Sequence, residues 1–362
     1  MIPMVDLKNQ YKLLKSEIDH GIQECLDNAH FILGPNVQKF EQEAAAYLGV
    51  KHAISCASGT DALHLALVAA GIGSGDEVIT TSFTFIATAE AIRYVGAIPV
   101  FVDIKQDTYN IDPSLIEAAI TAKTKAILPV HLFGQPADME RIMAIAAQHK
   151  IKVIEDCAQS FGADINGAMT GAIGLAGCHS FFPSKNLGCY GDGGMVTSND
   201  DGIAEKIKML RNHGSNVRYH HDIIGYNSRL DEIQAVILRS KLKRISAFNN
   251  GRRRAAHQYS EQLKNIVIPP HEDGIGTHVY HQYTLLSDKR DAIQEALSNK
   301  DIASAVYYPI PLHQQKVFEE EYGKLSLPVT EDISARCLSL PVFPELNTEQ
   351  VNLICEQIKS VF

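Results

Sequence analysis

The chain has 362 residues, of which 45% are hydrophobic and 21% charged, and this is enough for a large domain and a smaller one. Its formal net charge of −9, without a long block of like charge, argues against a nucleic acid or another polyanionic macromolecule as partner. The charge does not exclude a small phosphate ligand, because backbone amides and a few local cations bind phosphate whatever the overall sign.

The first predicted elements form a helical N-terminal arm. Residues 8–30 have helical character, and Gly34-Pro35 interrupts them before a second helix that runs to about residue 47. A short strand then ends at 58–60, and an apolar-periodic helix over 62–70 begins at once. We therefore expect a strand, a tight turn and a helix N-terminus at this point.

That helix start offers unpaired backbone N–H groups and the positive end of a helix dipole. Gly59 and Thr60 can hold a phosphate there, with Asp61 helping to start the helix. A simple helix cap is the alternative interpretation of the same residues.

Strand-like and helical segments then alternate through residue 155, which predicts an α/β fold with a mostly parallel sheet. The expected strands cover 77–80, 98–103, 126–132 and 152–155, and the expected helices cover 88–95, 113–120 and 137–149. Ligands of such sheets bind at the carboxyl ends of the strands. The residues that follow three of the strands are Phe83 and Phe85, His131 and Phe133, and Asp156 and Gln159.

A single lysine, Lys185, stands at the centre of the stretch CHSFFPSKNLGCYGDGGM over 178–195. Phe181 and Phe182 precede it, and the glycines after it let the backbone turn tightly and approach another body closely. An ordinary surface lysine needs no such surroundings, so we interpret Lys185 as the residue that carries a cofactor. A Gly-rich surface hairpin with an incidental lysine is the alternative.

The remaining chain predicts a connection to a second, smaller domain. A helical pattern that starts at Asp231 and extends toward Tyr259 is expected to link the two. From about residue 260, strand-like and helical segments form a compact α+β pattern. We therefore expect an N-terminal arm and large domain over 1–245 and a small C-terminal domain over 246–362.

Neither a signal-peptide pattern nor a run of 18 apolar residues is present, so we expect a cytoplasmic protein that does not enter a membrane. The seven cysteines are odd in number and form no CxxC pair, which fits reduced thiols. The fifteen histidines form no HExxH or similarly spaced pair, and no metal site is expected.

Several of these features fit one cofactor, pyridoxal phosphate, which carries a phosphate, a ring nitrogen and a reactive carbonyl. The helix start at Gly59-Thr60 would hold the phosphate, and Phe85 would lie on the ring. Asp156 would keep the ring nitrogen protonated, and Lys185 would form the Schiff base. The alternatives are that Phe85 is a core residue and that Asp156 is a solvated acid at a strand end.

The chemistry constrains the environment of the lysine. With an ordinary pKa of about 10.4, only about one lysine in 2,500 is neutral at pH 7. A nucleophilic Lys185 must therefore sit in a tight, partly desolvated pocket or near another cation.

Eight motifs, in this order and over nearly the whole chain, resemble the DegT/DnrJ/StrS family of sugar-nucleotide aminotransferases. The motifs are SGTDALHLAL, SFTFIATAEA, PVHLFGQPADM, VIEDCAQSFGA, SFFPSKNLGCYGDGG, RNHGS, GYNSRLDEIQAVIL and YYPIPLH. The resemblance implies a fold type I pyridoxal-phosphate-dependent transferase, with a mostly parallel seven-stranded sheet between helices and a smaller α+β C-terminal domain. It also implies a homodimer and pyridoxamine phosphate as the intermediate form of the cofactor.

The resemblance carries roles onto individual residues. Lys185 would be the Schiff-base lysine and later the acid/base of the proton shift, and Asp156 would pair with the pyridine nitrogen. Asn227 would reach the phosphate of the neighbouring subunit's cofactor. The other implied cofactor contacts are Gly59, Thr60 and Ser180 to phosphate, Gln159 near the ring hydroxyl and Phe85 on the ring, and the weaker candidates for substrate contact are Arg229, Tyr308 and His313.

The segment SKNLGCYGDGG is similar to members that aminate a 3-keto sugar rather than a 4-keto sugar. We expect transfer from glutamate, which leaves 2-oxoglutarate, to a UDP-2-acetamido-2-deoxy-3-oxo-hexuronate for surface polysaccharide such as lipopolysaccharide O-antigen. A dTDP-3-keto-6-deoxyhexose and a 4-keto sugar are alternative acceptors, and Arg229 is a possible partner of a uronate carboxylate. A cofactor-binding regulator without turnover is the alternative outside enzymes.

Overall fold

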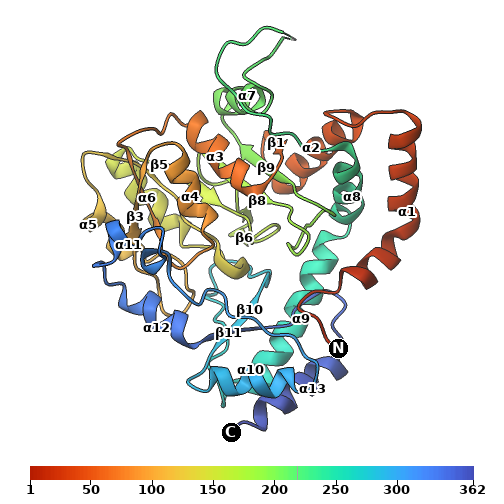
Figure 1. Ribbon diagram of the computed structural model, residues 1–362, viewed down its shortest axis with the longest axis vertical. Helices are drawn as coiled ribbons and strands as arrows, with labels where there is room; N and C mark the ends of the chain where they lie inside the picture. Colours follow the sequence, from red (N-terminus) through yellow and green to blue (C-terminus); the bar gives the residue numbers. More distant parts are fainter. Residues whose placement is uncertain (218) are drawn as a thin grey trace.

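The computed structural model describes residues 1–217 and 219–362, and a seven-stranded sheet lies at the centre of its larger body (Figure 1). The strand order is β1-β9-β8-β5-β4-β2-β3. Strand β9 pairs antiparallel with both of its neighbours, whereas the pairs from β8 to β3 are all parallel. The predicted α/β fold with a mostly parallel seven-stranded sheet is confirmed.

The strands of this sheet are β1 His52–Cys56, β2 Glu77–Thr81, β3 Ile98–Val102, β4 Thr124–Ile127, β5 Lys152–Asp156, β8 Ala176–Ser180 and β9 Gly194–Ser198. The helices of the first 242 residues are α1 Leu7–Asp27, α2 Pro35–Leu48, α3 Gly59–Ala69, α4 Ala87–Tyr94, α5 Ile116–Ala119, α6 Met139–His149, α7 Asp201–Leu210 and α8 Glu232–Leu242. Short 3₁₀ turns, η1 Pro113–Leu115 and η2 Leu132–Gly134, and a small hairpin of β6 Asp164–Ile165 and β7 Ala168–Met169 complete this part.

Successive side chains of each strand point to opposite faces of the sheet, and this explains why helices cover both faces. In β5, Ile154 packs into the core beneath α3 and α7, while Val153 packs into the core that contains residues of α6. Val78 and Ile79 divide in the same way between the two cores. Because successive side chains of a strand point to opposite faces, a sheet with apolar residues in succession must be covered on both sides.

The C-terminal body has its own apolar core around a two-stranded antiparallel sheet. It contains α9 Ile245–Leu263, β10 Tyr283–Leu286, α10 Arg290–Ser298, η3 Leu312–Gln314, α11 Glu319–Tyr322, α12 Pro328–Arg336, β11 Cys337–Leu340 and α13 Thr348–Lys359. Ile2 belongs to this core and forms a bridge with Ile302, so the start of the chain packs against the C-terminal body (Figure 1). The division of the chain at residues 245/246 stays a prediction.

Two expected elements differ from the structure. The strand expected over 126–132 ends at Ile127, because Pro129 has no N–H to donate to a ladder. The single linking helix from Asp231 is instead two helices, and at the break Lys243 and Arg244 both pair with Glu17 of α1. Across the described residues, no helix combines the length and the apolar character needed to span a membrane. The cytoplasmic location stays a prediction.

Candidate active site

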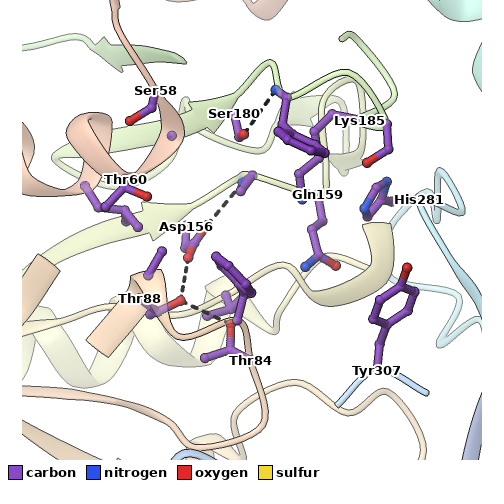
Figure 2. A pocket seen from close by; sticks show the side chains of 18 of the residues that line it. Ser58, Thr60, Thr84, Thr88, Asp156, Gln159, Ser180, Lys185, His281 and Tyr307 are labelled. Atoms are coloured by element: carbon purple, nitrogen blue, oxygen red, sulfur yellow. Dashed lines mark hydrogen bonds between the residues drawn. The ribbon is translucent and has the colours of Figure 1, made fainter. Parts of the chain in front are cut away.

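A cavity of about 440 Å³ opens where the carboxyl ends of the strands meet the C-terminal body. Both bodies contribute to its wall, and the labelled side chains converge on it from several elements (Figure 2). The polar and aromatic side chains and glycines that line it include Ser58, Gly59, Thr60, Thr84, Phe85, Thr88, Asp156, Gln159, Ser180, Ser184, Lys185, Asp192, His281, Gln282, Tyr307 and Tyr308.

The N-terminus of α3 forms one side of the cavity. The Ser58 hydroxyl caps the helix by accepting from the Asp61 backbone N–H over 3.1 Å, so the first two helical residues keep N–H groups without an acceptor inside the helix. A Cβ added at Gly59 would lie 2.5 Å from the Cβ of Ser180. Only glycine therefore lets the helix start approach Ser180 so closely, and this cradle has the shape and dipole of an anion site.

Asp156 is the last residue of β5 and is 4% exposed. Its Oδ2 accepts from the Thr88 hydroxyl over 2.8 Å, and its Oδ1 accepts from the Ala158 backbone N–H over 3.1 Å. Burial raises the pKa of the Asp156 carboxyl, and the hydrogen bonds from Thr88 and Ala158 and the charge of Lys185 oppose that increase. Asp156 is therefore a buried acid at the cavity rather than a solvated residue at a strand end.

Lys185 lies in the turn between β8 and β9, where its backbone N–H donates to the Phe182 carbonyl over 2.9 Å. Lys185 is half-buried and lines the cavity. Burial lowers the pKa of the Lys185 amine to about 8, against the opposing charge of Asp156. The desolvated surroundings that a nucleophilic lysine needs are thus present.

Gln159 and Phe85 complete the surroundings of these two charges. The Gln159 side chain accepts from the Phe133 backbone N–H over 2.8 Å and donates to the Tyr308 hydroxyl over 3.0 Å. Phe85 is 57% exposed and lines the cavity, so it is not a core residue, whereas its neighbour Phe83 is fully buried.

Three of the expected site residues do not line the cavity. Asn227 is exposed, and Arg229 donates to the Asn212 side chain over 3.2 Å. His313 is fully buried between the Ser82 hydroxyl, 2.8 Å from its Nδ1, and Glu331, 3.2 Å from its Nε2. Its ring nitrogens are therefore occupied within the protein and do not reach a ligand in this cavity.

Comparison with known proteins identifies the family. The model of the DegT/DnrJ/EryC1/StrS aminotransferase family matches residues 12–359. The chain belongs to this family.

Two curated relatives and one solved structure are similar to this aminotransferase over nearly its whole length. A UDP-N-acetyl-3-dehydro-alpha-D-glucosamine 3-aminotransferase of Acidithiobacillus ferrooxidans is 55% identical and covers 99% of this chain and 97% of its own. A UDP-2-acetamido-2-deoxy-3-oxo-D-glucuronate aminotransferase of Pseudomonas aeruginosa is 47% identical, with coverages of 98% and 99%. The crystal structure of S. venezuelae DesV with a ketimine intermediate has a TM-score of 0.97, 40% identity and coverages of 99% and 98%.

Aminotransferases of this family use pyridoxal phosphate, and the residues of the cavity fit that cofactor. The cradle between Gly59 and Ser180 suits its phosphate, the buried Asp156 suits a protonated ring nitrogen, and the Lys185 amine suits its aldehyde.

Sequence reasoning missed several residues of the wall. Thr84 and Thr88 lie within the motif SFTFIATAEA, and two threonines four residues apart in an apolar segment were an available signal. The other missed residues are His281, Gln282 and Tyr307 of the C-terminal body. No local sequence pattern there indicates which side chains pack against the large body.

A second group of ionisable side chains, His131, Glu155 and Cys157, is buried and does not line the cavity. Glu155 accepts from His131 and from the backbone N–H groups of Gly171, Ile173 and Gly174. The Nδ1 of His131 accepts from the Ala137 N–H over 3.0 Å. The imidazole and carboxylate are therefore already bonded inside the protein, and the group serves to fix the end of β5.

Proposed function

We propose that the protein transfers an amino group from glutamate to the C3 ketone of a UDP-linked 2-acetamido-3-oxo sugar. The observation that carries the proposal is the juxtaposition of Lys185 and Asp156 in one cavity at the carboxyl ends of the strands. The high identity to two UDP-sugar 3-aminotransferases supports the acceptor class.

Pyridoxal phosphate, when bound, supplies an electron sink that stabilises negative charge on the carbon next to the transferred nitrogen. The Nζ of Lys185 moves a proton to and from that carbon, because a pKa of about 8 lets it both take up and release protons near neutral pH. Asp156 would hold the proton on the ring nitrogen, and Phe85 would cover one face of the ring. Gln159 would contact the ring hydroxyl, and Gly59, Thr60 and Ser180 would bind the phosphate.

Tyr308 lies at the cavity and is positioned by Gln159, so it can contact the substrate. Lys185 is the one Lys or Arg side chain among the described residues that line the cavity. The carboxylates of glutamate and of a uronate acceptor each need a cation or several donors. We propose that Arg229 supplies this charge from a second copy of the chain.

Asn227 belongs to the same proposal. The segment between α7 and α8 projects away from the body of the molecule (Figure 1). Asn227 lies at its base, where it forms a bridge with Asn212, and it is exposed. Val217 and Ile224 of this segment are 62% and 89% exposed, as expected for apolar side chains that a partner covers. In the proposed homodimer, Asn227 reaches the cofactor phosphate of the neighbouring subunit.

The acceptor is tested with the pyridoxamine phosphate form of the purified protein and a panel of nucleotide sugars. We expect absorbance of the lysine-bound cofactor to return with UDP-linked 3-keto sugars. Return only with dTDP-linked 3-keto-6-deoxyhexoses or with 4-keto sugars would select one of the alternative acceptors. A protein that binds the cofactor but shows no spectral change with glutamate would support the regulator without turnover.

Mixing two inactive variants tests the shared site. Lys185→Ala and Asn227→Ala proteins are each expected to be inactive. In a mixed dimer, one site combines the intact Lys185 of one copy with the intact Asn227 of the other, so activity returns. Continued inactivity of a verified mixed dimer would contradict the exchange of Asn227 between subunits.

A further inference from the structure

A chain of two threonine hydroxyls leads from the cavity wall to Asp156 (Figure 2). The Thr88 hydroxyl donates to Asp156 Oδ2 over 2.8 Å, and the Thr84 hydroxyl lies 3.1 Å from that of Thr88. Thr84 and Thr88 are 2% and 1% exposed, so water does not compete freely for these bonds. Neither threonine is among the cofactor or substrate contacts proposed above.

The direction of the hydrogen bonds follows from the charge on Asp156. An ionised carboxylate only accepts hydrogen bonds, so the single hydroxyl proton of Thr88 points to Oδ2. Thr88 then offers only its lone pairs to Thr84, and Thr84 must be the donor of the second bond. Both hydroxyl dipoles therefore point toward the carboxylate, and aligned hydrogen bonds strengthen one another in a buried site.

Such a chain opposes the effect of burial on Asp156. Burial favours the neutral acid, which could not hold a proton on a ring nitrogen, whereas donated hydrogen bonds favour the carboxylate. The Ala158 N–H provides one such bond and belongs to the backbone. Among the described residues, Thr88 provides the one hydrogen bond to Asp156 that comes from a side chain, so a substitution at position 88 can remove it.

The same segment also carries Phe85. Thr84 and Phe85 lie between β2 and α4, and Thr88 is in the first turn of α4. This short segment thus brings the ring of Phe85 to the cavity. It also brings the hydroxyls of Thr84 and Thr88 to Asp156.

We propose that Thr88, oriented by Thr84, is a positioning residue that keeps Asp156 ionised and aimed at the ring nitrogen of pyridoxal phosphate. The proposal rests on the role of Asp156 in the proposed function. Thr88 acts through Asp156.

The test is binding of pyridoxamine phosphate to the full-length cofactor-free protein, measured by calorimetry. Thr88→Val keeps the shape and removes the hydroxyl, and loss of a hydrogen bond to a charged group predicts roughly ten- to hundredfold weaker binding. Thr88→Ser restores the hydroxyl and is expected to bind within about threefold of the parent. Thr84→Val removes only a neutral bond and is expected to weaken binding less than Thr88→Val does.

Thr80→Val is the matched control. Its hydroxyl is fully buried on β2 and donates to the Leu128 carbonyl over 2.8 Å, but it does not line the cavity. This variant loses a buried hydrogen bond of the same kind and is expected to bind pyridoxamine phosphate like the parent. The absorbance spectrum of the lysine-bound cofactor is a second readout, which is expected to change in Thr88→Val and not in Thr80→Val.

An Asp156→Asn variant separates the role of Asp156 from the role of Thr88. Binding and spectra like the parent's in Asp156→Asn would overturn the role of Asp156 itself. Weak binding in Asp156→Asn together with parent-like behaviour of Thr88→Val would leave that role standing and overturn the role of Thr88. If Thr88→Val binds weakly and Thr88→Ser does not restore binding, the effect comes from packing. That result would also overturn the role of Thr88.

Discussion

Gln159 and Tyr308 join the two bodies of the molecule at the cavity through a hydrogen bond of 3.0 Å. Gln159 follows β5 of the large body, and Tyr308 comes from the C-terminal body. The Oε1 of Gln159 accepts from the Phe133 N–H, so the carboxamide can present only its NH₂ group to Tyr308. The Tyr308 hydroxyl therefore accepts this bond and keeps its own proton for another partner.

Replacing Tyr308 with Phe should lower the stability of the protein. The buried NH₂ group of Gln159 would lose its acceptor, at a cost of about 1–3 kcal/mol in the free energy of unfolding. Urea unfolding measures this cost. Tyr94→Phe removes a hydroxyl from a side chain that is 59% exposed and should change the stability by less than about 0.5 kcal/mol. Equal stability of the two variants would show that the bond does not couple the bodies.

Replacing Gly59 with Ala should weaken cofactor binding. The new Cβ would lie 2.5 Å from the Cβ and 2.9 Å from the Oγ of Ser180, so the helix start and β8 must move apart. We expect at least about tenfold weaker binding of pyridoxamine phosphate, since displaced N–H groups lose charge-assisted hydrogen bonds to the phosphate. Titration of the cofactor-free protein measures the change.

Gly73→Ala is the control for this prediction. A Cβ at Gly73 meets no atom within 4 Å, and the residue does not line the cavity. It should bind the cofactor like the parent. If Gly59→Ala binds equally well, the phosphate does not sit between Gly59 and Ser180.

The residues that sequence reasoning placed at the cavity share a local signal. Asp156 and Gln159 end or follow a strand, and the ends of parallel strands meet at one edge of the sheet. Lys185 stands in a glycine-rich turn that an ordinary lysine does not need. Such positions depend on a few neighbouring residues and on one rule of topology, so a sequence can reveal them.

The remaining residues depend on packing between distant segments. His281 reaches the cavity because the C-terminal body folds back over the large one, and no periodic pattern encodes that return. His313 stands in a motif with Tyr308, yet Ser82, 231 residues away, and Glu331 occupy its ring. The break between α8 and α9 likewise has no glycine or proline at Lys243-Arg244 to announce it.

Glu41 should be important for the stability of the large body. Arg211 is 8% exposed and donates to Glu41 and to the Ser55 carbonyl, which links α2, β1 and the end of α7. Glu41→Ala leaves this guanidinium without its carboxylate and should cost about 3 kcal/mol or more in unfolding free energy. Glu43→Ala breaks a more exposed pair with Arg239 and should cost about 1 kcal/mol or less. Similar losses in the two variants would contradict the importance of burial at Arg211.

The last prediction concerns the pH dependence of cofactor capture. Only the neutral amine of Lys185 attacks an aldehyde, and burial lowers its pKa to about 8. About a tenth of the amine is then neutral at pH 7, and the fraction rises with pH until it levels off above about pH 9. The initial rate of covalent capture of pyridoxal phosphate by the cofactor-free protein should follow the same curve.

The measurement covers pH 7 to 10, where at least about nine-tenths of the cofactor phosphate, with a pKa of about 6, is in its doubly charged form, so its titration contributes little. Lys185→Ala removes the specific amine and should show no capture in the cavity. A rate that keeps rising to pH 10 would mean that Lys185 has the pKa of a solvated lysine. In that case burial would not lower the pKa of the amine before the cofactor binds, and the bound cofactor itself would have to lower it.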